Sequence, residues 1–276
     1  MSFLTLPGDT PLPLFYTDTG GEGRPVVLIH GWPLSAEAWA AQEQPLADAG
    51  YRVVAYDRRG FGRSGKAAFG YEYDTLASDL NTLLTELDLT DAVLVGHSMG
   101  GGEVARYLGT YGSGRVAAAV LVGAITPALC QTDDNPDGGM PFEGFADLRN
   151  QCRGDREGFL RQFMTWFFSN PSQMTISESQ FAEVLRIAAQ GSDQALQDCI
   201  LAWATDFRAD LAKIDVPTLV IHGDADNNVP FEASGKRVPQ FVKHAEVRVV
   251  PGGPHGLPVS HAAEFNALLL EFVGSL

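Results

Sequence analysis

The sequence has few cysteines, few basic residues and no long hydrophobic run. Cys130, Cys152 and Cys199 are an odd, widely spaced set that fits neither a disulfide framework nor a zinc signature, which favours free thiols. With 19 Lys and Arg against 34 Asp and Glu, the net charge is -15, and no basic cluster is present to bind nucleic acid or an anionic membrane. No window approaches the length of a membrane span, and the N-terminus lacks a signal-peptide pattern. We therefore expect a cytoplasmic protein that acts on a small molecule, with neither nucleic-acid nor membrane partners.

Short apolar runs recur along the chain between glycine or aspartate residues. Most are continuously apolar, which is typical of parallel strands that helices cover on both faces. They are Val26–Ile29, Tyr51–Tyr56, Ala92–Val95, Ala118–Val122, Thr218–Ile221 and Glu246–Val250. Leucines at helical spacing between Leu76 and Leu87 predict a crossover helix, and Ser2–Leu6 with Leu12–Thr17 predicts an antiparallel hairpin at one edge. This alternation predicts an α/β fold with a doubly wound, mostly parallel, eight-stranded sheet.

From about Thr126 to Asp210 the pattern changes to helical segments with no convincing strand. We predict a helical cap over residues 126–210, inserted after the sixth strand of a core domain formed by residues 1–125 and 211–276. The cap is rich in aromatic residues, which could wall an apolar pocket or could only pack the cap onto the core. These aromatics are Phe159, Phe163, Trp166, Phe167, Phe168, Trp203 and Phe207.

A serine stands between glycines directly after one apolar run, in the segment Gly96-His97-Ser98-Met99-Gly100. This G-x-S-x-G pattern is typical of a nucleophile elbow, a strained strand-to-helix turn that needs small residues on both sides and exposes the serine hydroxyl. The alternative is a glycine-rich turn whose serine only caps the following helix. The strand signal before and the helix signal after Ser98 favour the nucleophile.

A serine hydroxyl needs a base to take its proton and an acid to hold that base. In hydrolases with this elbow, the acid and then the histidine follow on loops after later strands. Of the six histidines, His255 has the expected loop position after the last strand. Asp224 and Asp226 share the preceding candidate loop and either could face the imidazole, although Asp224 also suits a turn role. We favour Asp226 as the acid.

Attack on a carbonyl creates an oxyanion, which preorganised backbone N–H groups stabilise well. Met99 follows the nucleophile at a helix start and offers one donor, aided by the helix dipole. Trp32, in the loop after the first long apolar strand, is the natural second donor, because Pro33 has no N–H. The alternative is that this loop is an ordinary turn.

Motifs spread over nearly the whole chain resemble those of the α/β-hydrolase superfamily. More narrowly, they are similar to those of its cofactor-free haloperoxidase, arylesterase and γ-lactamase group. The segments that carry the resemblance are His30–Ser35, Tyr56–Ser64, Gly96–Gly101, the Asp226 loop and Pro254–Leu257.

The resemblance implies that Ser98 is the nucleophile, Asp226 the acid and His255 the base, with Trp32 and Met99 as oxyanion donors. It implies no metal and no cofactor. The activity it implies is hydrolysis of small carboxylic esters through an acyl-enzyme, with perhydrolysis as a side activity that gives a peracid and thereby oxidises halide. Hydrolysis of a lactam amide or a carbon–carbon bond is an alternative on the same triad, as is a slow-turnover ligand-binding receptor.

The substrate pocket is harder to assign, because it depends on how the cap packs. Members of the group that favour perhydrolysis typically have a proline after the aromatic oxyanion residue, as Pro33 follows Trp32 here. We expect the pocket to be lined by Trp32, Pro33, Phe142, Trp166, Phe167, Trp203, Val229 and Leu257.

Overall fold

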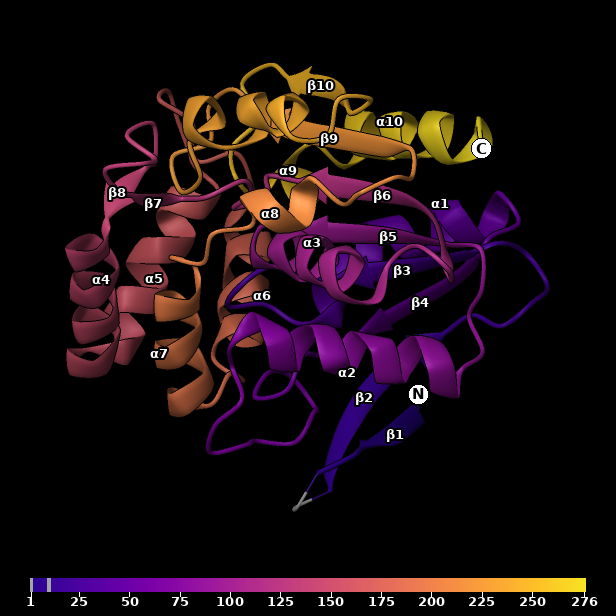
Figure 1. The fold of residues 1–276 in the computed structure, drawn as a ribbon. Coiled ribbons are helices and arrows are strands. Elements are labelled where there is room, and N and C mark those ends of the chain that lie inside the picture. The colour runs from indigo at the N-terminus through magenta and orange to yellow at the C-terminus, as the bar shows by residue number, and fades with distance from the viewer. Residues whose placement is uncertain (1, 9–10) are drawn as a thin grey trace.

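A mostly parallel sheet of eight strands forms the centre of the molecule, which a computed structural model describes over residues 2–8 and 11–276 (Figure 1). The strand order is β1-β2-β4-β3-β5-β6-β9-β10, and the edge strands β1 and β2 form the expected antiparallel hairpin. β2 also pairs antiparallel with β4, and the remaining neighbours are parallel. The strands are β1 Ser2–Leu6, β2 Leu12–Asp18, β3 Pro25–Ile29, β4 Arg52–Tyr56, β5 Ala92–His97, β6 Val116–Val122, β9 Thr218–Gly223 and β10 Glu246–Val250.

Helices cover both faces of the sheet, because alternate residues of the buried strands point to opposite sides. Val27 and Ile29 of β3 join the core cluster under α2 and α3, whereas Val26 and Leu28 join the cluster under α1 and α10. Figure 1 shows α2 and α3 in front of the sheet and α1 behind it. The doubly wound α/β fold is therefore confirmed. These helices are α1 Ala40–Asp48, α2 Tyr73–Glu86, α3 Met99–Tyr111 and α10 Ala262–Gly274.

Residues 126–210, which we call the cap segment, follow β6 and precede β9. They are mainly helical, as expected, but they also contain a pair of two-residue strands, β7 and β8, that the sequence pattern did not indicate. Figure 1 shows α4, α5 and α7 grouped beyond one end of the sheet, where the central parallel strands finish. The segment comprises β7 Cys130–Gln131, β8 Met140–Pro141, α4 Phe142–Gly154, α5 Arg156–Phe167, α6 Glu178–Ala188, α7 Asp193–Ala202 and all but the last residue of α8 Arg208–Leu211.

Shorter helices lie in the connections between these elements. They are the 3-10 helices η1 Ala36–Trp39, η2 Phe231–Ala233 and η3 Gly235–Gln240, and the four-residue α9 Leu257–Ser260. None of the helices in the described part of the chain combines the length and the apolar character needed to span a bilayer.

Candidate active site

Ser98 stands alone between the last residue of β5 and the first residue of α3. Its φ of 56° lies in the left-handed region, where a residue with a side chain is strained by about 1–3 kcal/mol. The turn is tight: a Cβ on Gly96 would lie 2.3 Å from the Gly100 carbonyl oxygen, and one on Gly100 would lie 2.5 Å from the Ile29 carbonyl oxygen. The glycines around the serine are therefore required by the close approach of backbone to backbone, as the elbow pattern predicts.

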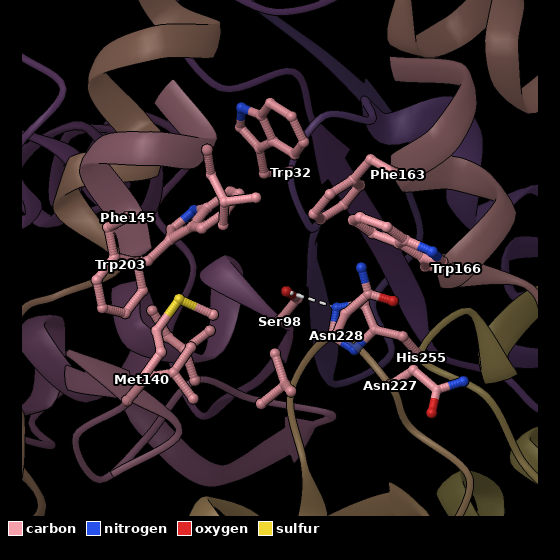
Figure 2. Close-up of a pocket in the computed structure, with 14 residues that line it drawn as sticks. Trp32, Ser98, Met140, Phe145, Phe163, Trp166, Trp203, Asn227, Asn228 and His255 are labelled. Atoms are coloured by element: carbon pink, nitrogen blue, oxygen red, sulfur yellow. Dashed lines mark hydrogen bonds between the residues drawn. The ribbon is translucent and has the colours of Figure 1, made fainter. Parts of the chain in front are cut away.

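Ser98, His255 and Asp226 form a continuous hydrogen-bonded row, although they are far apart in the sequence. Figure 2 shows the Ser98–His255 half of this row. His255 Nε2 lies 2.8 Å from Ser98 Oγ, and His255 Nδ1 lies 2.7 Å from Asp226 Oδ2. Because the carboxylate can only accept, Nδ1 carries the proton and Nε2 is left to accept from the serine hydroxyl. Asp224, the other acid that the sequence left open, is exposed and accepts the Gly252 N–H instead.

Asp226 uses both carboxylate oxygens. Oδ1 accepts the backbone N–H groups of Asn228 and Val229, at 3.0 and 2.8 Å, and Oδ2 faces His255 and, at 3.3 Å, His222 Nε2. Burial alone would raise the pKa of Asp226, but His255 and His222 hold it well below its ordinary value. The carboxylate therefore stays ionised and can stabilise a positive charge on His255.

Two further histidines also contact this row. His222 faces the acid, as described, and its Nε2 also donates to the Val229 carbonyl oxygen at 2.9 Å. His97 Nε2 donates to the backbone oxygen of His255 at 2.9 Å. Burial lowers the pKa of His97 to about 3, aided by the neighbouring His255, so this ring stays neutral. A histidine that directly follows an apolar run was the only sequence signal for either residue.

The two expected oxyanion donors lie next to the elbow. Met99 is the first residue of α3, so its N–H has no helical carbonyl to bond. The loop that carries Trp32 packs directly on the elbow, since a Cβ on Gly31 would lie 3.1 Å from Ser98 Cβ. The Trp32 N–H makes no hydrogen bond within the described residues, whereas its indole N–H donates to the Leu196 carbonyl oxygen at 3.2 Å.

A mainly apolar cavity opens beside Ser98 and His255 (Figure 2). Of the expected lining residues, Trp32, Trp166, Trp203 and Val229 contribute to it. Its wall comprises Trp32, Ser98, Ile125, Leu129, Met140, Phe145, Leu148, Phe163, Trp166, Trp203, Asn227, Asn228, Val229 and His255. The cap segment supplies half of these side chains, which makes it the roof of the cavity.

Four residues expected in the pocket lie elsewhere, which corrects that part of the assignment. Phe142 is 50% exposed at the start of α4, and Pro33 is buried without reaching the cavity. Phe167 packs edge-on against the His255 ring, with centroids 4.6 Å apart, so it supports the base instead of the substrate. Leu257 is buried in the core cluster under α1 and α10.

Several lining residues were not predicted from the sequence. Phe163 precedes Trp166 by three positions, and Phe145 precedes Leu148 by three, so each pair shares one helix face. Once one member of a pair is known to line the cavity, this spacing predicts that the other lines it too. Asn227 and Asn228 follow Asp226 directly, and the turn held by the Asp226 carboxylate brings them to the cavity wall.

Comparison with known proteins places the chain among enzymes. Residues 24–262 match the family model described as alpha/beta hydrolase fold. A non-heme chloroperoxidase of Kitasatospora aureofaciens is 45% identical over 265 residues, covering 94% of this chain and 95% of that protein. A bifunctional esterase/perhydrolase of Acinetobacter calcoaceticus is 41% identical over 267 residues, covering 95% and 96%.

A solved structure titled as a bromoperoxidase from Bacillus anthracis superposes with a TM-score of 0.95 at 46% identity, covering 99% of this chain and all of that one. These similarities extend over nearly the full length of each compared protein, so they include both the sheet and the cap segment. The chain belongs to the α/β-hydrolase family, among relatives named as non-heme haloperoxidases and esterase/perhydrolases.

Proposed function

We propose that this protein is a serine esterase that cleaves small carboxylic esters through an acyl-enzyme. The observation that carries the proposal is the buried Ser98–His255–Asp226 row, with contacts of 2.8 and 2.7 Å, at the wall of an apolar cavity. A serine that donates to an imidazole whose other nitrogen is held by a carboxylate is the arrangement that activates serine as a nucleophile. The esterase/perhydrolase relative supports the same chemistry.

In the first half of the reaction, His255 Nε2 takes the proton of Ser98 as Oγ attacks the ester carbonyl carbon. The negative charge on the carbonyl oxygen is held by the N–H groups of Trp32 and Met99. Collapse of this intermediate breaks the ester C–O bond, and His255 returns its proton to the leaving alcohol. Asp226 keeps the imidazole oriented and stabilises its positive charge throughout.

In the second half, a water molecule attacks the acyl group on Ser98 while His255 takes its proton. The ester bond to Oγ breaks, the carboxylic acid leaves and Ser98 regains its hydrogen. Hydrogen peroxide in place of water gives a peracid by the same steps, and the peracid can then oxidise a halide in solution. Pro33, which follows the oxyanion residue Trp32, is our candidate for favouring peroxide, by re-aiming the Trp32 carbonyl toward it.

The cavity indicates the size of the acyl group. Its volume is about 110 Å³, below the roughly 150 Å³ of an apolar cavity that holds benzene. Its wall is mainly aromatic and aliphatic, so it offers few hydrogen bonds to a substrate beyond those at the reacting carbonyl. We therefore expect acetyl and butyryl esters to be accepted and large acyl groups to be poor substrates.

The test is steady-state hydrolysis of p-nitrophenyl acetate and butyrate by the wild type and by Ser98→Ala. Hydrogen peroxide and a halide-dependent dye are added in parallel. We expect turnover by the wild type and a loss of about 10⁴-fold or more in kcat for Ser98→Ala, with an unchanged fold. Absence of turnover by the folded wild type would overturn the esterase proposal in favour of a bulkier substrate or a receptor.

The peroxide arm tests perhydrolysis separately. We expect dye oxidation that requires Ser98, peroxide and halide together. Pro33→Leu is expected to lower the ratio of perhydrolysis to hydrolysis while leaving ester cleavage in place. An unchanged ratio would remove Pro33 from the proposal without affecting the esterase activity.

A further inference from the structure

A buried arginine that the proposed mechanism does not use lies next to the elbow. Arg58 follows β4 by two residues and is 1% exposed. Its Nε lies 2.8 Å from Oε2 of Glu103, a fully buried residue of α3. The other Glu103 oxygen accepts the Tyr56 hydroxyl hydrogen. One end of the arginine is thus bonded to the helix that starts directly after Ser98.

The other bonds of Arg58 go to the loop that carries Trp32. The guanidinium Nη2 donates to the backbone oxygen of His30 at 2.8 Å, and the Arg58 backbone N–H donates to His30 Nε2 at 3.0 Å. Arg58 therefore bridges two segments, α3 through Glu103 and the loop after β3 through His30. Each of these segments carries one of the two expected oxyanion donors.

His30, held by Arg58, in turn fixes the peptide group between Gly31 and Trp32. Because its Nε2 accepts a hydrogen bond, the ring proton is on Nδ1, which donates to the Gly31 carbonyl oxygen at 2.9 Å. Burial and the nearby Arg58 charge hold the pKa of His30 well below its ordinary value, which keeps this tautomer neutral. The Gly31 oxygen also accepts the Leu34 N–H at 3.0 Å. Since a trans peptide group is planar, with its C=O and N–H pointing in opposite directions, fixing the Gly31 oxygen also fixes the Trp32 N–H.

We propose that Arg58 is a positioning residue for the oxyanion hole, which holds the Trp32 N–H in register with the Met99 N–H of the nucleophile helix. The inference rests on the proposed esterase function. A guanidinium suits this task, because its planar fork can serve Glu103 and His30 at the same time, whereas a lysine ammonium is a compact point charge on a flexible stem. A displacement of about 1 Å at such a donor costs up to about 100-fold in rate.

The test compares Arg58→Lys with Arg59→Lys. Arg59 is the matched control, because it is adjacent in sequence, is mostly buried, and pairs with Asp79 of α2 through two contacts of 2.5 and 2.6 Å. It has no bond to the His30 loop or to α3 among the described residues. Both substitutions keep a positive charge beside the paired carboxylate, which is Glu103 for Arg58 and Asp79 for Arg59, and both remove the planar guanidinium. Steady-state kcat and KM for p-nitrophenyl butyrate and the melting temperature are measured for both variants and for the wild type.

For Arg58→Lys we expect kcat to fall by about 10- to 100-fold with KM within about twofold of the wild type. For Arg59→Lys we expect both constants to stay within about twofold, at a similar loss of melting temperature. An unchanged kcat for folded Arg58→Lys would overturn the inference, and so would equal losses of kcat in both variants. If Arg58→Lys does not fold, His30→Phe takes its place, because it keeps a ring of similar volume and removes both nitrogen contacts, and the same criteria apply. Absence of Ser98-dependent turnover in the wild type would instead overturn the esterase function, and the inference with it.

Discussion

The two sides of the cavity are held together by different interactions. On the sheet side, Ser98, His255 and Asp226 lie on loops after β5, β10 and β9, and each is fixed by directional hydrogen bonds of 2.7 to 3.0 Å. On the cap side, Phe163 and Trp203 pack around Trp32 by ring contacts, with centroids 4.8 and 5.0 Å from it. Hydrogen bonds fix atoms to within a few tenths of an ångström, whereas ring packing fixes mainly volume and shape.

This difference separates rate from selectivity. A substitution on the sheet side disturbs the alignment of reacting atoms, so it is expected to lower kcat for every ester. A substitution on the cap side changes the space offered to the acyl group, so it is expected to change the relative rates of different esters. The first two predictions below test this separation, with the larger expected effect on rate first, and the last tests the buried, neutral state of His97 on the sheet side.

The largest effect is expected for Asp226→Asn on the sheet side. The amide oxygen can still accept the N–H groups of Asn228 and Val229, but it cannot stabilise a charged His255 as the carboxylate does. We expect kcat for all p-nitrophenyl esters to fall by about 10⁴-fold, with KM little changed. Steady-state kinetics and a melting curve check this.

Asp224→Asn is the matched control for this substitution. Asp224 is exposed and lies two residues away, and its carboxylate bonds only the Gly252 N–H among the described residues. We expect its kcat to stay within about twofold of the wild type. Comparable losses in the two variants would show that the loop as a whole, and not the acid facing His255, sets the rate.

An intermediate effect is expected for Trp166→Ala on the cap side. Trp166 lines the cavity yet is 41% exposed, so its removal widens the cavity at a small cost in stability. We expect kcat/KM for butyrate relative to acetate to fall by about tenfold, because the longer chain loses apolar contacts that acetate does not make. The ratio is measured with the two p-nitrophenyl esters under identical conditions.

Phe142→Ala is the control on the same segment. Phe142 is similarly exposed, at 50%, but does not line the cavity. We expect the butyrate-to-acetate ratio to stay at the wild-type value. A ratio that moves equally in both variants would mean that cap-segment substitutions act through a general loosening, and the separation between rate and selectivity would fail.

The same division decides what the sequence could predict. The eight strands of the central sheet were predicted within two residues of their observed ends, because buried parallel strands are continuously apolar and their loops carry glycine and aspartate. Ser98 and His255 followed from their positions after such strands. The choice between Asp224 and Asp226 depends on which of the two side chains points toward His255. Hydrogen bonds from backbone N–H groups of the folded loops fix both orientations, and the sequence does not reveal them.

The cap side was much less predictable from sequence. Phe142 and Phe167 are aromatic, as many pocket-lining residues are. The rotation of α4 and α5 about their axes, however, decides which aromatic side chain faces the cavity. That rotation is set by packing with distant segments, for example by Phe167 against the His255 ring. The Arg58 bridge was missed for the same reason, since Arg58, Glu103 and His30 meet only when three strands are placed side by side.

The last prediction concerns the pH dependence of stability, which tests whether His97 on the sheet side is buried and neutral. The pKa of His97 is about 3 in the folded protein against 6.5 for an ordinary histidine. Between these pH values the unfolded chain binds a proton that the folded chain does not, so this residue lowers stability as the pH falls through that window, by up to about 1.4 kcal/mol per pH unit. In His97→Gln, which keeps a donor for the His255 oxygen, this contribution is absent. The free energy of unfolding is measured by urea titration at several pH values between 6.5 and 4.5. We expect it to depend less steeply on pH in His97→Gln than in the wild type, by up to one proton. Equal slopes in the two proteins would mean that His97 is protonated in the folded protein.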